Sequence, residues 1–199
     1  SNLGFETTQI PNGLDLSLFE QKENRKFAKQ VIFAGRLSKE KGIDTLIEIC
    51  KKLPVEIHLV IIGDGPEAKK IKKIESEHEN IHYLGSQNHH QTISLIKGSD
   101  ILIQPSLSEG ISTTLLEAMA CKTCIITSTV GGNLELIKDQ ESGILIEPTN
   151  HEMFCKKIIE LMSDLSLRNK FSTLAHETVK KYDWNIIGKR YLDLYNSLL

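Results

Sequence analysis

The sequence has no excess of basic charge, no long apolar run and no complete set of zinc ligands. Its 24 Lys and Arg residues against 26 Asp and Glu residues give a formal net charge of −2, which offers no electrostatic basis for binding nucleic acid. No run approaches the roughly 20 apolar residues of a transmembrane helix, and the chain does not start with the basic-then-apolar pattern of a signal peptide. These absences predict a globular cytoplasmic protein.

The cysteines do not form a redox or zinc motif. They are Cys50, Cys121, Cys124 and Cys155, and the middle pair has Cys-x-x-Cys spacing. A redox pair of this kind places its nucleophile at a helix N-terminus, where the helix dipole stabilises the thiolate. Here Cys121 is expected to end a helix and Cys124 to open a strand, and no second pair completes a zinc site. We therefore expect buried, reduced thiols and no metal.

Short apolar segments alternate with amphipathic ones along most of the chain. The strand-like segments cover residues 30–34, 56–62, 81–84, 101–104, 124–127 and 143–146. The helical patterns between them cover residues 43–53, 66–77, 91–98, 113–120 and 133–138. This alternation predicts an α/β fold, with a Rossmann-like parallel sheet of about six strands and helices on both faces. Helical patterns at residues 152–163, 165–182 and 184–199 predict that the chain ends in several helices.

Two carboxylates stand eight residues apart after the fourth expected strand. Glu109 lies in a polar turn, whereas Glu117 lies in a helix whose other residues from Leu115 to Cys121 are apolar or small. An ionised carboxylate in such a helix is costly unless it is paired or hydrogen-bonded. No Lys or Arg stands three or four residues from Glu117. Its partner is therefore either a distant cation or the hydroxyls of a ligand.

Two elements that suit phosphate follow expected strands, at the edge where parallel sheets bind ligands. Gly35 permits a tight turn after residues 30–34, and Arg36 and Lys41 then offer one planar fork and one point charge for a diphosphate. These two side chains could equally be ordinary cations of a surface loop.

The second such element is the start of the helix at residues 113–120. Ser112 is its expected N-cap, so the amides of Ser112, Thr113 and Thr114 point outward at the positive end of the helix dipole. Such a helix start binds either an anion or water. Glu109 is close enough in sequence to reach a ligand held there.

A series of short motifs resembles one family. The motifs are Ile10-Pro-Asn-Gly, Gly35-Arg36 with Lys41-Gly42, Gly63-Asp-Gly-Pro66, residues 99–106, Glu109 with Glu117, Val130-Gly-Gly132, residues 143–148 and Trp184. In this order and spacing the chain resembles the C-terminal, donor-binding half of GT-B glycosyltransferases of the retaining family-four (group 1) type. The Gly63-x-Gly65 turn lacks the third glycine of a dinucleotide fingerprint and is not interpreted as one.

The resemblance implies a role for each candidate residue. Arg36 and Lys41 would hold the diphosphate of a nucleotide sugar, Glu109 would contact the donor sugar, Glu117 would accept hydrogen bonds from the ribose, and residues 84–87 would lie near the base. The expected catalytic residues are Glu109, Arg36 and Lys41. The expected substrate-binding residues are Gly35, Arg36, Lys41, Leu84, Glu109, Gly110, Ile111, Ser112, Thr113, Thr114 and Glu117.

The implied reaction is glycosyl transfer from a nucleotide-diphosphate sugar to a glycan or lipid-linked acceptor, as in polysaccharide or lipopolysaccharide biosynthesis. It would retain the anomeric configuration and need neither a metal nor a cofactor. The alternative is a standalone nucleotide-binding or regulatory module without transferase activity.

The resemblance also implies a division of the chain. Residues 1–15 would be the remnant of an interdomain linker, residues 16–183 the nucleotide-sugar-binding domain, and residues 184–199 a helix that packs on an N-terminal acceptor domain. We expect the isolated domain to bind nucleotide weakly and to transfer little or no sugar. Membrane contact would run through the other half, with the full-length protein cytoplasmic and peripheral to the membrane.

Overall fold

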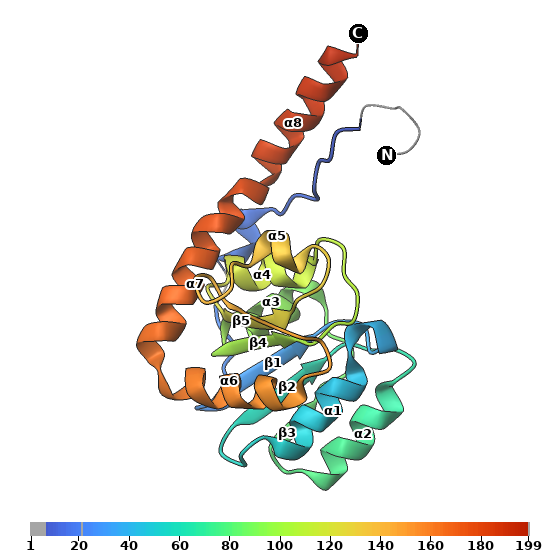
Figure 1. Ribbon diagram of the computed structural model, residues 1–199, viewed down its shortest axis with the longest axis vertical. Helices are drawn as coiled ribbons and strands as arrows, with labels where there is room; N and C mark the ends of the chain where they lie inside the picture. The colour runs from blue at the N-terminus through green and yellow to red at the C-terminus, as the bar shows by residue number, and fades with distance from the viewer. Residues whose placement is uncertain (1–6, 21, 199) are drawn as a thin grey trace.

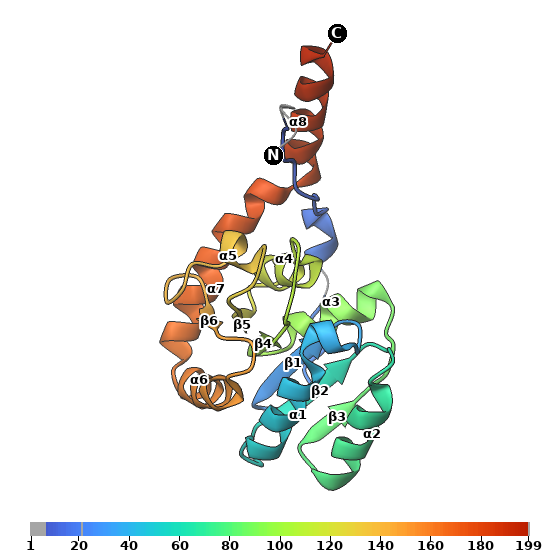
Figure 2. The same cartoon turned by 45° about the vertical axis from the view of Figure 1, so that its right-hand side comes forward.

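Six parallel strands form one sheet in the order β3-β2-β1-β4-β5-β6 (Figure 1, Figure 2). The computed structural model describes residues 7–20 and 22–198. The strands are β1 (Gln30–Ala34), β2 (His58–Ile62), β3 (Ile81–Tyr83), β4 (Ile101–Gln104), β5 (Cys124–Ser128) and β6 (Ile144–Ile146). This is the Rossmann order, in which the direction of winding reverses between β1 and β4. The predicted fold class is confirmed.

Helices cover both faces of the sheet because alternate side chains of each strand point to opposite sides. Val31 and Phe33 of β1 belong to the core beneath α1 (Ile43–Lys52), α2 (Ala68–Glu77) and α6 (His151–Ser163). Ile32 and Ala34 belong to the core beneath α3 (His89–Lys97), α4 (Thr113–Ala120) and α5 (Asn133–Leu136). Helix α7 (Leu165–Val179) contributes side chains to both cores.

Several boundaries differ from the sequence prediction for local reasons. Helix α3 begins two residues early because Asn88 caps it: its side chain accepts from Gln91 N at 2.9 Å, and the Gln91 side chain accepts from Asn88 N at 3.2 Å. The predicted helix over residues 165–182 ends at Val179 and is followed by the 3-10 turn Lys180–Tyr182. The 3-10 turns Leu16–Phe19 and Lys39–Lys41 had no sequence prediction.

The final helix, α8 (Trp184–Ser197), projects away from the rest of the molecule (Figure 1, Figure 2). Its first residue is paired with the predicted linker, since Trp184 N donates to Leu14 O at 3.1 Å and Leu14 N donates to Tyr182 O at 2.7 Å. Ile187 of α8 is buried. In this part of the chain, the large apolar side chains that remain exposed are Trp184, Ile186, Leu192 and Tyr195 of α8 and Leu198 at its C-cap.

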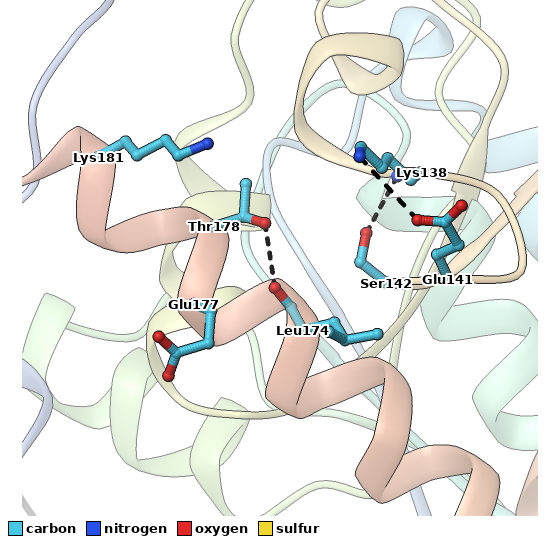
Figure 3. Close-up of a pocket in the computed structure, with 7 residues that line it drawn as sticks. All are labelled: Lys138, Glu141, Ser142, Leu174, Glu177, Thr178 and Lys181. Atoms are coloured by element: carbon cyan, nitrogen blue, oxygen red, sulfur yellow. Dashed lines mark hydrogen bonds and ion pairs between the residues drawn. The ribbon is translucent and has the colours of Figure 1, made fainter.

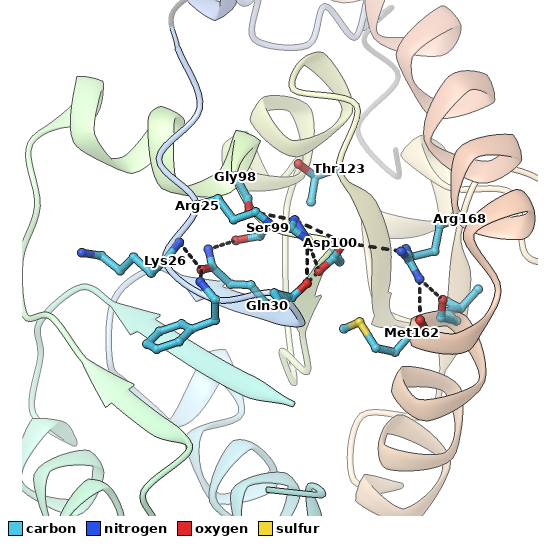
Figure 4. A network of polar contacts seen from close by, with 12 residues as sticks. Arg25, Lys26, Gln30, Gly98, Ser99, Asp100, Thr123, Met162 and Arg168 are labelled. Carbon is cyan, nitrogen blue, oxygen red and sulfur yellow. Dashed lines mark hydrogen bonds and ion pairs between the residues drawn. The ribbon is translucent and has the colours of Figure 1, made fainter. Parts of the chain in front are cut away.

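A network of ion pairs and hydrogen bonds joins the amino ends of β1 and β4 to α7 (Figure 4). Asp100 accepts from Gln30 N at 2.9 Å, forms an ion pair with Arg25 at 2.7 Å, and lies 3.5 Å from Arg168 Nη2. Arg168 also donates to Met162 O at 2.8 Å. These contacts lie at the edge of the sheet opposite to the candidate site, and we interpret them as structural.

The four cysteines are buried and unpaired, as predicted. Cys121 is the C-cap of α4 and Cys124 opens β5, and burial raises the pKa of each thiol to about 12. Within residues 7–20 and 22–198, no His, Cys, Asp and Glu side chains gather in threes to hold a metal ion. In the same residues, no helix has the length and apolarity needed to span a bilayer.

Replacing Gly42 with alanine should destabilise the fold. Gly42 has a φ of 70°, and a Cβ there would lie 1.8 Å from the backbone oxygen of Pro105, in the loop after β4. The left-handed backbone alone makes us expect a loss of about 1–2 kcal/mol for Gly42→Ala, and the clash adds to it. Gly188→Ala is the control: it lies in helix α8 with open space around it, so it should be neutral or stabilising. Urea unfolding measures both, and equal stability of the two variants would contradict this account.

The stacked rings of Phe27, His58 and His82 should make stability depend on pH. His58 Nδ1 lies 2.9 Å from His82 Nε2, and burial, followed by the charge of His58, lowers the pKa of His82 below its usual value. Because the pKa of His82 is lower in the folded than in the unfolded chain, the unfolded chain binds more protons just below pH ~6.5. The contribution of His82 to the free energy of unfolding is therefore fully present above that pH and is lost as the pH drops. Urea midpoints between pH 7.5 and 5.5 should fall less for His82→Gln than for the wild type. The exposed His90→Gln should keep the wild-type slope, and an unchanged slope in His82→Gln would rule this cause out.

Candidate active site

The loops that follow β1 and β4 meet at the carboxyl edge of the sheet, where the winding reverses. Leu107 N of the β4 loop donates to Glu40 O of the β1 loop at 2.8 Å. The close approach of Gly42 to Pro105 joins the same two loops. Open α/β sheets bind their ligands in such a crevice. The sequence prediction that the functional residues follow these strands is therefore consistent with the topology.

Glu109 is the centre of a buried polar network in this crevice. Its side chain is 8% exposed, and Oε1 accepts from Lys41 Nζ at 2.6 Å and from Ser106 Oγ at 2.7 Å. Gln104 Nε2 donates to the same oxygen. No hydrogen bond between described residues uses Oε2, so this oxygen remains for a ligand. Lys41 and Glu109, predicted separately as diphosphate and sugar contacts, are in fact one ion pair.

Gln104 connects Glu109 to the start of α4, and sequence reasoning missed it. It is the last residue of β4 and is almost fully buried. While Nε2 donates to Glu109, Oε1 accepts from Ser112 Oγ at 3.0 Å. A buried glutamine is stable only when both ends of its amide have partners. The sequence signal that could have identified Gln104 is that it is a polar residue at the end of an otherwise apolar strand.

Ser112 caps α4 as predicted. Its side chain accepts from Leu115 N at 3.4 Å, and the exposed Thr113 and half-buried Thr114 form the first turn. The Gly131-Gly132 turn supports the loop before it: a Cβ on Gly131 would lie 1.9 Å from Glu109 O. Gly110 is exposed and Ile111 packs against the core of the α3–α4 face. The helix start is thus held rigidly beside Glu109.

Arg36 lies apart from this network. Its side chain is exposed and, within the described residues, makes no hydrogen bond or ion pair. Its charge is one of the smaller causes that lower the pKa of Glu40, after backbone and Ser38 hydrogen bonds. The structure therefore places Lys41 in the network and leaves the guanidinium of Arg36 available to an anion in solution.

Glu117 has a partner in His89, which the sequence did not predict. His89 Nε2 lies 2.8 Å from Glu117 Oε1, although the two residues belong to different helices. Glu117 is buried, and this burial raises the pKa of its carboxyl group while the hydrogen bond to His89 lowers it. Spacing along the chain does not reveal such a contact between two helices.

A cavity of about 170 Å³ lies beside these residues, at the carboxyl ends of β1 and β2. Gly35 and Gly63 line it, together with Thr92 of α3 and Thr114 of α4. Ser86 and Gln87, from the loop after β3, also line it. Leu84 itself does not line the cavity: it packs on the core, and its carbonyl accepts from Gln87 Nε2 at 2.7 Å.

A second cavity, of about 240 Å³, lies between α7 and the loop before β6 (Figure 3). Its polar contacts are local, such as Thr178 Oγ1 to Leu174 O at 3.0 Å and Lys138 N to Ser142 Oγ at 3.0 Å. All of its charged side chains are exposed. It lies at the amino end of β6, away from the loop that contains Glu109 and from the first turn of α4.

Residues 17–178 match the family described as glycosyl transferases group 1. A similar protein of Campylobacter jejuni is N,N'-diacetylbacillosaminyl-diphospho-undecaprenol alpha-1,3-N-acetylgalactosaminyltransferase. It is 29% identical over 170 residues, which cover 85% of this chain and 45% of that protein. The chain spans about half the length of the curated relatives that it matches, 52% and 54% for two of them.

Solved structures have the same fold. The structure of Anabaena Alr3699/HepE in complex with UDP-glucose aligns with a TM-score of 0.84 at 20% identity, covering 94% of this chain and 57% of that one. The C-terminal domain of a glycosyl transferase group 1 family protein (LpcC) from Francisella tularensis aligns with a TM-score of 0.75 at 29% identity. In that case the alignment covers 86% of this chain and 99% of the other.

Gln104→Leu should destabilise the protein because it leaves polar groups of Glu109 and Ser112 without a partner. Each buried group that loses its hydrogen bond costs about 1–3 kcal/mol, so we expect a loss in that range by urea unfolding. Gln87→Leu is the matched control, since that half-buried amide makes one local bond to Leu84 O. If Gln104→Leu were as stable as Gln87→Leu, the network would not be what holds the two loops together.

Proposed function

Because the chain belongs to the glycosyl transferases group 1 family, we propose that it binds a nucleotide-diphosphate sugar as the donor for glycosyl transfer. The observation that carries this proposal is the convergence of Lys41, Glu109 and the start of α4 at the carboxyl edge of the sheet. A cation, hydrogen-bond acceptors and helix amides are together the groups that a sugar diphosphate needs. The Anabaena structure with UDP-glucose adds support at the level of the fold.

In this proposal the donor lies across the β1 and β4 loops. Arg36 and Lys41 hold the diphosphate, with the amides of Ser112, Thr113 and Thr114. Glu109 directs Oε2 to a sugar hydroxyl, because Oε1 is already used by three donors. Glu117 accepts from the ribose, and the cavity beside Ser86 and Gln87 takes the base.

The chemical step uses electrostatic stabilisation. As the bond to the diphosphate breaks, negative charge grows on the leaving oxygen, and the cations with the α4 helix start stabilise that charge more strongly than they stabilise the bound donor. We propose that the anomeric configuration is retained and that no metal or cofactor takes part, since Arg36 and Lys41 supply the positive charge. Glu109 acts by orienting the sugar, and the three donors on Oε1 make that oxygen a poor nucleophile.

The acceptor is proposed to bind to another part of the protein. The chain spans about half of its relatives, and the exposed apolar side chains of α8 suit a surface that a second domain covers. We propose an N-terminal domain of the same polypeptide as that partner. The name of the Campylobacter relative supports a lipid-linked acceptor, with a glycan as the other candidate.

Replacing Arg36 tests the donor site most simply. UDP, GDP and ADP, with their sugar conjugates, are titrated calorimetrically against the wild type and Arg36→Ala. Loss of one charge-assisted contact is worth about 1.5–3 kcal/mol, so the variant should bind its preferred nucleotide roughly 10- to 100-fold more weakly. Lys39→Ala is the control, because Lys39 is an exposed cation on the same loop. Equal weakening by both substitutions, or no binding by the wild type, would count against the proposal.

The isolated chain should bind donor without transferring sugar efficiently. Donor turnover by residues 1–199 is compared with that of the full-length protein on a mixture of lipid-linked acceptors. We expect transfer by the longer protein only, since the acceptor is proposed to bind outside this domain. Efficient transfer by the isolated chain would contradict the division between the two halves.

A further inference from the structure

The contact between His89 and Glu117 joins α3 and α4, and each of these helices contributes one threonine to the lining of the cavity at the carboxyl ends of β1 and β2. Thr92 and Thr114, which line the cavity, stand one helical turn from His89 and Glu117 respectively. Residues three apart on a helix share a face, so the pair lies next to the two threonines that line the cavity. The contact is therefore part of the cavity's surroundings and not a remote surface bridge.

The two members of the pair differ in their surroundings. Glu117 is nearly buried with a side-chain exposure of 9%, while that of His89 is 55%. A buried carboxylate is costly without a donor, and the solvated imidazole supplies one from Nε2 at little desolvation cost. Only Oε1 of Glu117 is used by a described hydrogen bond, which leaves Oε2 available on the same carboxylate.

We propose that His89 is a positioning residue for the donor: through Nε2 it holds Glu117 Oε1 and so presents Oε2 to the ribose hydroxyls of the nucleotide. This inference rests on the proposed function, in which Glu117 contacts the ribose. Without His89, burial favours the protonated acid, which accepts hydrogen bonds from a diol poorly.

The other ionisable groups near this pair have different partners. Cys121 of α4 and Cys124 of β5 have thiols whose pKa is raised by burial to about 12, so both remain neutral between pH 6 and pH 9. His176 of α7 lies 3.2 Å from Met119 O, and Glu177 pairs with Lys180. The remaining charged groups on the flanking elements are exposed or bonded elsewhere: His90 and Lys97 on α3, Glu135 on α5, and Asp15 and Glu20 at the 3-10 turn before β1.

The test compares ligands that have and lack the ribose hydroxyls. UDP, GDP and ADP, each with its 2′,3′-dideoxy counterpart, are titrated against the wild type, His89→Phe and His89→Gln at pH 7. We expect His89→Phe to bind the preferred ribonucleotide about tenfold more weakly, with unchanged affinity for the dideoxy form. His89→Gln keeps a neutral donor and should recover most of the lost affinity. His90→Phe, at an exposed neighbouring position, should match the wild type.

The split between ribonucleotide and dideoxynucleotide binding separates positioning from a general structural role. A loss confined to the ribonucleotide, with recovery in His89→Gln, indicates positioning, whereas a general structural role would weaken both forms. Equal weakening of ribo- and dideoxynucleotides, or no weakening at all, would overturn the role of His89. If the wild type bound no nucleotide, the proposed function itself would fail. If Arg36→Ala weakens nucleotide binding and His89→Phe does not, this inference is wrong while the proposed function stands.

Discussion

The ion pair between Glu109 and Lys41 is the interaction on which the rest of the site depends. It joins the loops after β1 and β4 where the winding of the sheet reverses, and Gln104 extends it to the cap of α4. A buried carboxylate is tolerable only because three donors converge on one of its oxygens. Those same donors fix the direction of the other oxygen. Stability and ligand recognition therefore have the same physical origin at this edge of the sheet.

The polar residues at the amino edge and at the carboxyl edge of the sheet have different roles. At the amino edge, Asp100 joins β1 to α7 through arginine pairs, and its charges are neutralised within the protein. At the carboxyl edge, Arg36 and Thr113 are exposed, and no hydrogen bond between the described residues uses Oε2 of Glu109. Exposed charge and a carboxylate oxygen without a protein donor suit a ligand site, whereas the arginine pairs of Asp100 suit a structural network.

Sequence periodicity predicted all six strands, because each is a short apolar run with clear turn residues at its ends. It also predicted the cap at Ser112, since local capping depends on neighbouring residues. It could not predict the partners of Glu117 and Glu109. Those contacts join His89 to Glu117 across 28 positions and Lys41 to Glu109 across 68, so they exist only once the sheet has brought the loops together. Gln104 was missed for the same reason.

The most direct test of the account is where a nucleoside diphosphate binds. UDP, GDP and ADP are titrated in turn into isotopically labelled protein, and backbone amide resonances are followed by nuclear magnetic resonance. The account predicts that the largest shifts fall at residues 35–42, 86–92 and 109–117, with none at the cavity between α7 and the loop before β6. Shifts centred on that second cavity, or scattered evenly over the surface, would contradict it.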